Sequence, residues 1–236
     1  MVADFICGKG VHEIDYFNIQ SQGNAQEFGD IAEVTYQQAS FGSNTRCFVA
    51  GGAGPSTNPN DVIEFVTFSS LGDATDFGDL SQARRNPSGV SNQTRGVITG
   101  GANVNELSAY NTMDYVTMSS SGDAIDFGDR TITVFTSTGG INSPTRGVFG
   151  GGVNSAPGYD EYNIIDFITI ASTGNAQDFG KISEGRYAGG ASNQVRGVIV
   201  GGYKSPGDFN TNIEYITIPT AGNAIDFGND IESRYS

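Results

Sequence analysis

The hydrophobic and polar positions of this 236-residue chain follow a pattern that returns about every 50 residues. Its most regular part is a run in which apolar and polar residues alternate. In residues 213–218, Ile-Glu-Tyr-Ile-Thr-Ile, a polar residue falls at roughly every second position, which is the period of a half-buried β-strand. Self-similarity at this period is typical of propellers, solenoids and arrays. Copies of the run begin at Ile14, Ile63, Met113, Ile165 and Ile213.

Each repeat has four pieces. The first is an apolar run closed by glycines, such as residues 46–52, and the alternating run is the second. The third is Ser-x-x-Gly-Asn/Asp-Ala-x-Asp/Glu-Phe-Gly, whose Gly-Asn or Gly-Asp is a hairpin signal because these residues tolerate positive φ. The fourth is a looser run, such as residues 84–90, followed by a polar turn. The second-last residue of the third piece is an aromatic residue that we expect to be buried as part of the structural repeat: Phe28, Phe77, Phe127, Phe179 and Phe227.

A four-stranded antiparallel unit of this kind cannot bury both of its faces alone. Packed side by side around an axis, five such units bury a continuous core and leave only short edges. We therefore expect one all-β domain over residues 1–236, a five-bladed β-propeller with four antiparallel strands per blade. Residues 232–236 match the start of the fourth piece. This match predicts that a C-terminal inner strand pairs with the N-terminal strands and closes the ring.

Differences between the repeats are concentrated in inserts between the glycine pairs and the alternating strands. The inserts are residues 53–61, 102–112, 153–163 and 203–212. Variable loops at one fixed point of a repeat project on one face, which is often the binding face. Exposed rings there could stack on sugars or anchor a protein partner, although packing within their own loops is an equally good interpretation. The candidate binding residues are Tyr110, Tyr159, Tyr162, Tyr203 and Phe209.

Composition and charge narrow the function classes. The 34 glycines and the absence of tryptophan suit many short strands joined by tight turns. A net charge of −14 repels phosphate backbones, and the pair Arg84 and Arg85 is no basic patch, so we expect no nucleic-acid partner. Cys7 and Cys47 are too few for a disulfide framework and are expected to be free thiols. Neither a signal-peptide pattern nor a run of membrane-spanning length is evident, so we expect no signal peptide and no membrane insertion.

The chemistry-bearing residues favour a structural interpretation. Asp-Phe-Gly occurs four times without the other motifs of a kinase. His12 is the only histidine, which removes Ser-His-Asp triads and histidine metal centres, and we expect it in a surface loop. A carboxylate pair such as Asp160 and Glu161 leaves glycoside hydrolysis as the remaining enzymatic alternative. We therefore expect no enzymatic activity and no cofactor.

Metal binding is also disfavoured. Asp73, Asp76 and Asp79 could suggest a calcium loop, but they fall on a strand and two turns and need not converge. The equivalent Asp123, Asp126 and Asp129 share this interpretation. The arginines that follow the polar turns occupy equivalent places, and we expect them to pair with a carboxylate or carbonyl between repeats rather than with a ligand. These arginines are Arg46, Arg95, Arg146 and Arg196.

The order of the pieces resembles a kelch-type propeller repeat. An apolar strand ending in Gly-Gly is followed by a strand with Asp15-Tyr16, Asp114-Tyr115 or Glu214-Tyr215, and then by the blade-ending aromatic. Phenylalanine stands where kelch repeats usually carry tryptophan, so the repeat is kelch-like. Over nearly the whole chain the pattern also resembles repeats in virion structural and tail-fibre-like proteins of marine bacteriophages, cyanophages especially.

The resemblance implies a virion or cell-surface structural or interaction module that mediates attachment or assembly through its variable loops. Its partners would be other virion or surface proteins or a host surface glycan, and its location a virion or an extracellular surface assembly. An oligomeric state within a larger assembly stays open. A purely structural decoration component is the alternative, and a carbohydrate-active enzyme is the least favoured.

Overall fold

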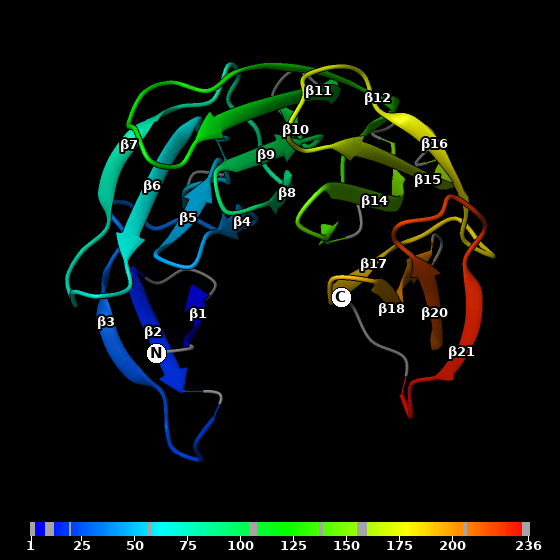
Figure 1. Ribbon diagram of the computed structural model, residues 1–236, viewed down its shortest axis with the longest axis horizontal. Helices are drawn as coiled ribbons and strands as arrows, with labels where there is room; N and C mark the ends of the chain where they lie inside the picture. Colours follow the sequence, from blue (N-terminus) through cyan, green and yellow to red (C-terminus); the bar gives the residue numbers. More distant parts are fainter. Residues whose placement is uncertain are drawn as a thin grey trace.

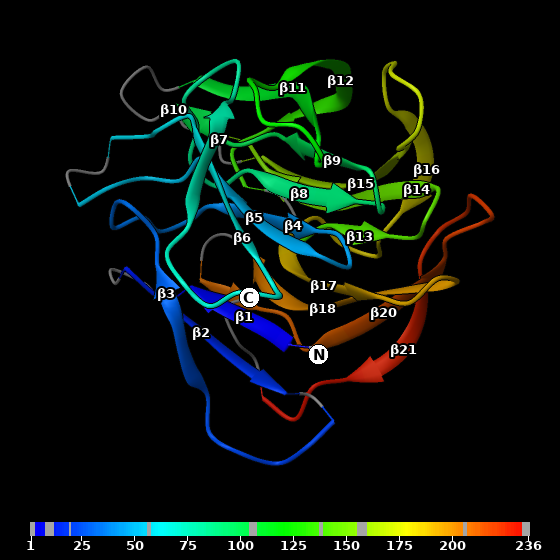
Figure 2. The ribbon, with the colours of Figure 1, turned by 60° about the vertical axis from the view of Figure 1, so that its left-hand side comes forward.

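The computed structural model describes residues 3–7, 12–18, 20–55, 58–103, 108–136, 139–154, 160–204 and 207–232. They form five antiparallel β-sheets, which follow one another in chain order around an arc (Figure 1, and turned by 60° in Figure 2). The prediction of an all-β protein with several four-stranded antiparallel sheets is confirmed. Within the described residues, no helix is long and apolar enough to cross a membrane.

The sheets are numbered here in chain order. The first sheet has the order β1-β2-β3, with β1 at Ala3–Cys7, β2 at Glu13–Asn18 and β3 at Gln26–Asp30. The second has the order β4-β5-β6-β7, with strands at Ala39–Gly42, Arg46–Ala50, Val62–Thr67 and Thr75–Asp79.

The third sheet joins β8 (Ser88–Ser91), β9 (Arg95–Thr99), β11 (Ser108–Thr117) and β12 (Ile125–Val134), and β10 (Ala102–Asn103) also pairs with β11. The fourth joins β13 (Ile141–Asn142), β14 (Arg146–Val153), β15 (Glu161–Thr169) and β16 (Gln177–Lys181). The fifth joins β17 (Tyr187–Ser192), β18 (Arg196–Lys204), β20 (Asn212–Thr217) and β21 (Ile225–Asn229), and β19 (Asp208–Phe209) pairs with β18.

The four pieces of the repeat have fixed places in each sheet. The looser fourth piece forms β4, β8, β13 and β17, and β4, β8 and β17 lie toward the centre of the arc (Figure 1). The Phe-Gly piece forms the strand on the outside of each sheet. In the first sheet β1, β2 and β3 correspond to β5, β6 and β7, so its described strands number three and its inner strand is missing from them. Residues 233–236, which the predicted C-terminal inner strand requires, lie outside the described residues.

The core of the protein lies between successive sheets. Ile14, Phe28 and Val66 are buried between the first and second sheets, and Phe41 with Ile98 between the second and third. Two further clusters join the third sheet to the fourth and the fourth to the fifth. Because a sheet inside the arc packs on both sides, both faces of its middle strand are buried, as Ile63 and Glu64 on opposite faces of β6 show.

A bulge recurs where the outer strand meets the middle strand. Ile63 pairs with Gly78 and Glu64 pairs with Asp76, so Phe77 is the extra residue and its ring turns into the core. Gly78 has a φ of 143°, and a Cβ there would lie 2.5 Å from the carbonyl carbon of Gly122 in the next sheet. Glycine is required because the next sheet approaches the backbone at this point.

That approach is a repeated contact that we call the turn seam. Gly72 N–H donates to Phe28 O at 2.9 Å, and Ala74 N–H donates to Asp30 O at 2.7 Å. In return the Asp30 N–H donates to Oδ1 of Asp73 at 3.1 Å. The two halves of the Gly-Asn/Asp-Ala…Phe-Gly motif are therefore complementary across neighbouring sheets. Three further seams join Phe77 to Gly122, Phe127 to Gly174 and Phe179 to Gly222, each at 2.7 Å.

The expectation of a buried aromatic is wrong at one of the five positions. Phe28, Phe77, Phe127 and Phe179 are buried, whereas Phe227 is 56% exposed. In the four buried copies the ring is covered by the turn of the following sheet, and no sheet follows the fifth in the described arrangement. Burial of this aromatic thus depends on a neighbouring sheet rather than on the hairpin itself.

Candidate functional site

The variable inserts lie at one end of their sheets. Each connects the glycine-closed strand to the alternating strand, at the end opposite the Arg46 and Thr67 pair in the second sheet. The same registers place the inserts at the equivalent end of the third, fourth and fifth sheets. Three of the inserts are partly extended backbone, because β10, β19, the first half of β11 and the start of β15 are built from insert residues.

Two of the candidate tyrosines pack within their own sheets. Tyr110 pairs with Val134 across β11 and β12, and the guanidinium of buried Arg84 lies 5.9 Å from the Tyr110 ring. Tyr162 pairs with Gly152 in the fourth sheet, and both tyrosines are half-buried. Tyr159 lies outside the described residues. The five candidates therefore do not form one site, since the four that are described are distributed over three sheets.

The fifth sheet gathers the aromatic residues that do lie together. The Tyr203 ring lies 5.5 Å from Phe209 and 5.6 Å from Tyr187, all three half-buried. Tyr187 comes from the inner strand β17, outside the inserts, so the search for aromatic residues within inserts missed it. The feature that could have identified Tyr187 is the strand order, which places the fourth piece beside the glycine-closed strand.

Polar groups border these three rings, which we call the aromatic trio. The Tyr203 hydroxyl accepts a hydrogen bond from Gly207 N–H at 3.1 Å. Lys204 lies 3.6 Å from the Glu184 carboxylate, and the Asn210 amide donates to the same carboxylate at 3.5 Å. Aromatic faces beside an exposed carboxylate, amide and ammonium can bind a sugar or a peptide side chain.

The acidic residues of the outer turns are used within the fold. Asp73 and Asp123 each accept a backbone hydrogen bond in a turn seam. Burial and the nearby carboxylates of Asp61 and Asp123 raise the pKa of Asp79, as expected where carboxylates lie close together. In the described part of the chain, no group of three His, Cys, Asp or Glu side chains could hold a metal ion.

Among the described residues, neither His12 nor Cys47 is grouped with the side chains that a catalytic site would require. Exposed His12 places Nδ1 3.1 Å from the Ile31 carbonyl oxygen, which fixes the ring beside the first turn seam. Cys47 is half-buried, and its Sγ donates to the Phe48 carbonyl oxygen at 4.0 Å. The side chain of Cys7 lies outside the described part.

Three of the four repeated arginines join neighbouring sheets. Arg46 Nη1 donates to the Met118 carbonyl of the next sheet at 2.9 Å, and its guanidinium lies 4.5 Å from the Phe65 ring in its own sheet. Arg95 and Arg146 repeat both contacts, with Ile170 O and Ile218 O as acceptors. Arg196 lies over Tyr215 at 4.3 Å in the fifth sheet. Arg46, Arg95 and Arg146 therefore hold neighbouring sheets together at the end of the sheets away from the inserts.

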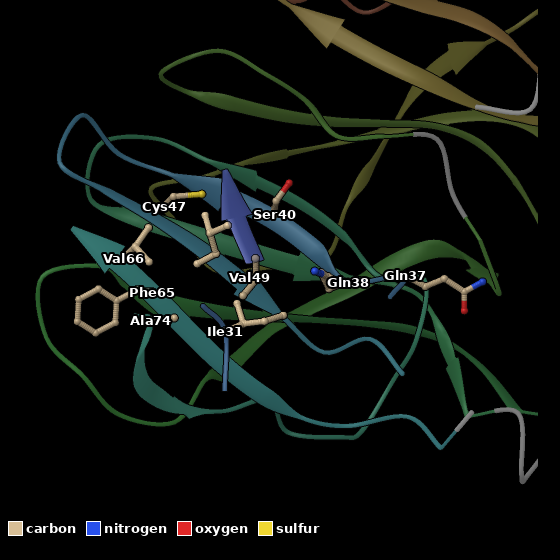
Figure 3. Close-up of a pocket in the computed structure, with 10 residues that line it drawn as sticks. Ile31, Gln37, Gln38, Ser40, Cys47, Val49, Phe65, Val66 and Ala74 are labelled. Atoms are coloured by element: carbon tan, nitrogen blue, oxygen red, sulfur yellow. The ribbon is translucent and has the colours of Figure 1, made fainter. Parts of the chain in front are cut away.

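A cavity of about 340 Å³ lies between the first and second sheets (Figure 3). Cys47, Val49, Val66 and Ile31 line its apolar part, and Gln38 and Ser40 lie along its inner side. At the position equivalent to Cys47, the later sheets carry glycines that are covered by an inner-strand side chain of the preceding sheet. These pairs are Gly96 with Phe41, Gly147 with Val90 and Gly197 with Ile141. The cavity therefore lies beside Cys47, where the later sheets have a side chain from the inner strand of the preceding sheet.

Comparisons with known proteins identify no relative. No protein-family model matches the chain, and no curated protein matches it significantly. The resemblance to kelch repeats and to phage virion proteins accordingly stays a prediction.

Proposed function

We propose that the protein is a non-enzymatic structural or interaction module of a virion or cell surface, which mediates attachment or assembly through its inserts. The observation that carries the proposal is that the constant and the variable parts of the repeat have different roles. The motif that recurs five times supplies the turn seams, and two rings of the aromatic trio, Tyr203 and Phe209, come from an insert, where the repeats differ. A scaffold with constant contacts and variable loops at one end suits recognition.

We further propose that the five sheets are the blades of a kelch-like β-propeller. Equivalent turn seams, arginine contacts and inter-sheet cores support a rotational repeat. Closure through a C-terminal inner strand beside β1 is supported by the cavity next to Cys47, which lies where such a strand belongs.

The net charge of −14 bears on the partner class. A partner with a basic or neutral surface fits this charge, whereas a polyanion is repelled. A neutral host glycan or another virion or surface protein meets this condition, and so the proposal names these two classes.

The test is binding of the purified protein to a glycan array and to host cell surfaces, with wild type compared to Tyr203→Ala. The matched control is Leu71→Ala, which removes an exposed apolar side chain from an outer turn at the opposite end of the sheets. We expect binding to fall for Tyr203→Ala and to persist for Leu71→Ala. A protein that joins a particle but binds neither glycan nor host surface would instead be a purely structural decoration component. Release of products from a polysaccharide would favour a carbohydrate-active enzyme.

A further inference from the structure

The two ends of the arc carry opposite halves of the turn seam. At the N-terminal end, Gly23-Asn24-Ala25 has the same place in its sheet as Gly72-Asp73-Ala74. At the C-terminal end, Phe227-Gly228-Asn229 has the place of Phe28-Gly29-Asp30. Each half makes its contact in every seam inside the arc, and neither end half makes one in the described arrangement.

Burial shows what the C-terminal end lacks. Phe179 in the fourth sheet is 3% exposed and Phe227 in the fifth is 56% exposed, although both rings lie edge-on to the aromatic of their middle strand. Phe227 is therefore a large apolar side chain left uncovered at the position where each preceding sheet is covered by its neighbour.

We infer that residues 227–229 bind the turn at residues 23–25 of the same chain and form a fifth turn seam. Following the four existing seams, Gly23 N–H donates to Phe227 O and Ala25 N–H donates to Asn229 O. The Asn229 N–H donates to Oδ1 of Asn24, the acceptor that Asp73, Asp123, Asn175 and Asn223 supply elsewhere. This inference rests on the proposed propeller and names the contact on its outer side that completes the ring.

The same chain is the favoured occupant because its two halves are tethered. Figure 1 shows the first and fifth sheets on either side of the opening in the arc. A tethered partner has an effective concentration in the millimolar range, about a thousandfold above a second copy at micromolar concentration. A seam with identical contacts therefore forms within the chain before it forms between chains.

The contact between the first and second sheets has the most room to adjust during closure. It contains the cavity of about 340 Å³ beside Cys47. It also lacks a buried ion pair, because no described arginine contacts Glu64, whereas Asp114, Asp166 and Glu214 at the equivalent positions are paired with Arg84, Arg130 and Arg186. The first sheet can therefore move away from the second and toward the fifth. This separation costs less free energy than separating any other two neighbouring sheets.

Hydrogen exchange of the full chain tests the inference directly. Closure predicts that the amides of Gly23 and Ala25 exchange as slowly as those of Gly72 and Ala74, independently of protein concentration and with a monomeric mass in solution. Asn24→Ala should accelerate exchange at residues 23–25 and 227–229 together, whereas Gln22→Ala in the same turn should not. Rapid exchange at both ends in the wild type would overturn the inference. Protection that appears only as the protein dimerises would also overturn it, in favour of a second copy.

Thermal unfolding provides a second, independent readout. In a closed ring Phe227→Ala should lower the Tm about as much as Phe77→Ala, because both rings would be covered. If the ring is open, Phe227→Ala leaves the Tm nearly unchanged and the inference is overturned. Asn24→Ala should keep the Tyr203-dependent binding, since Asn24 lies in the outer turn of the first sheet, whereas the aromatic trio lies on β17, β18 and β19 of the fifth sheet. Loss of the seam and loss of the proposed function are thus separable.

Discussion

The buried pair of Arg130 and Asp166 offers the sharpest test of what holds the sheets together. The Asp166 carboxylate accepts a hydrogen bond from Nη2 of Arg130 at 2.7 Å, and both side chains are fully buried. The same carboxylate accepts the backbone N–H and the hydroxyl of Thr131 at 3.1 and 3.0 Å. Arg130 belongs to β12 of the third sheet and Asp166 to β15 of the fourth, so the pair spans two sheets.

We predict that Arg130→Met destabilises the protein strongly. Methionine preserves much of the apolar stem but leaves the Asp166 charge buried without a counter-charge, and breaking such a pair costs about 3–5 kcal/mol. At a size of 236 residues one kcal/mol corresponds to about 2 °C in Tm, so the expected decrease is about 6–10 °C. Adding Asp166→Asn removes the stranded charge and keeps an acceptor for Thr131. The double variant should therefore recover a large part of the loss.

The assay is a double-mutant cycle followed by calorimetry and by urea unfolding. Lys204→Met is the matched control, because Lys204 and Glu184 are 3.6 Å apart and partly exposed, and such a pair contributes about 0–1 kcal/mol. A loss of stability below about 1 kcal/mol for Arg130→Met would refute this reasoning, because burying an unpaired carboxylate costs more free energy than that. A double variant less stable than Arg130→Met alone would show that the charge is not the cause.

Three further predictions follow from the sheet contacts. Gly96→Ala would place a Cβ 2.1 Å from the Phe41 ring and should cost about 1–3 kcal/mol in urea unfolding, while Gly54→Ala, with no atom nearer than 3.8 Å, should be nearly neutral. Burial raises the pKa of Glu64, and the hydrogen bond that its carboxylate accepts from the Ala32 N–H only partly opposes this. The folded state is therefore more stable when Glu64 is protonated. Stability is lost as the pH rises from about 4.5 through the raised pKa. Glu64→Gln should match wild type near pH 4 and be relatively more stable at pH 7; a constant difference in Tm would contradict this. Arg95→Ala removes the bond to Ile170 O and the contact with the Tyr115 ring, and should lower Tm by a few degrees while insert-dependent binding is retained.

Much of the architecture can be predicted from the chain because its signals are local and repeated. Alternation in residues 213–218 and the Gly-Asn or Gly-Asp turns specify strands and hairpins without reference to distant residues. Five copies of one motif then require five similar sheets, and the structure has them. The place of the inserts at one end of the sheets follows from the same strand order.

Tertiary structure alone decided which side chains meet. The sequence presents Arg84 and Arg186 seven residues after Phe77 and Phe179, but Arg130 only three after Phe127, yet all three reach the acidic residue of a middle strand. Tyr187 joins Tyr203 and Phe209 only because inner and glycine-closed strands pair. Phe227 lies in the same Asp-Phe-Gly motif as Phe77 but is exposed, because the partner that buries this ring is always a different sheet. Strand formation is a property of each segment, whereas burial of this aromatic is a property of its neighbours.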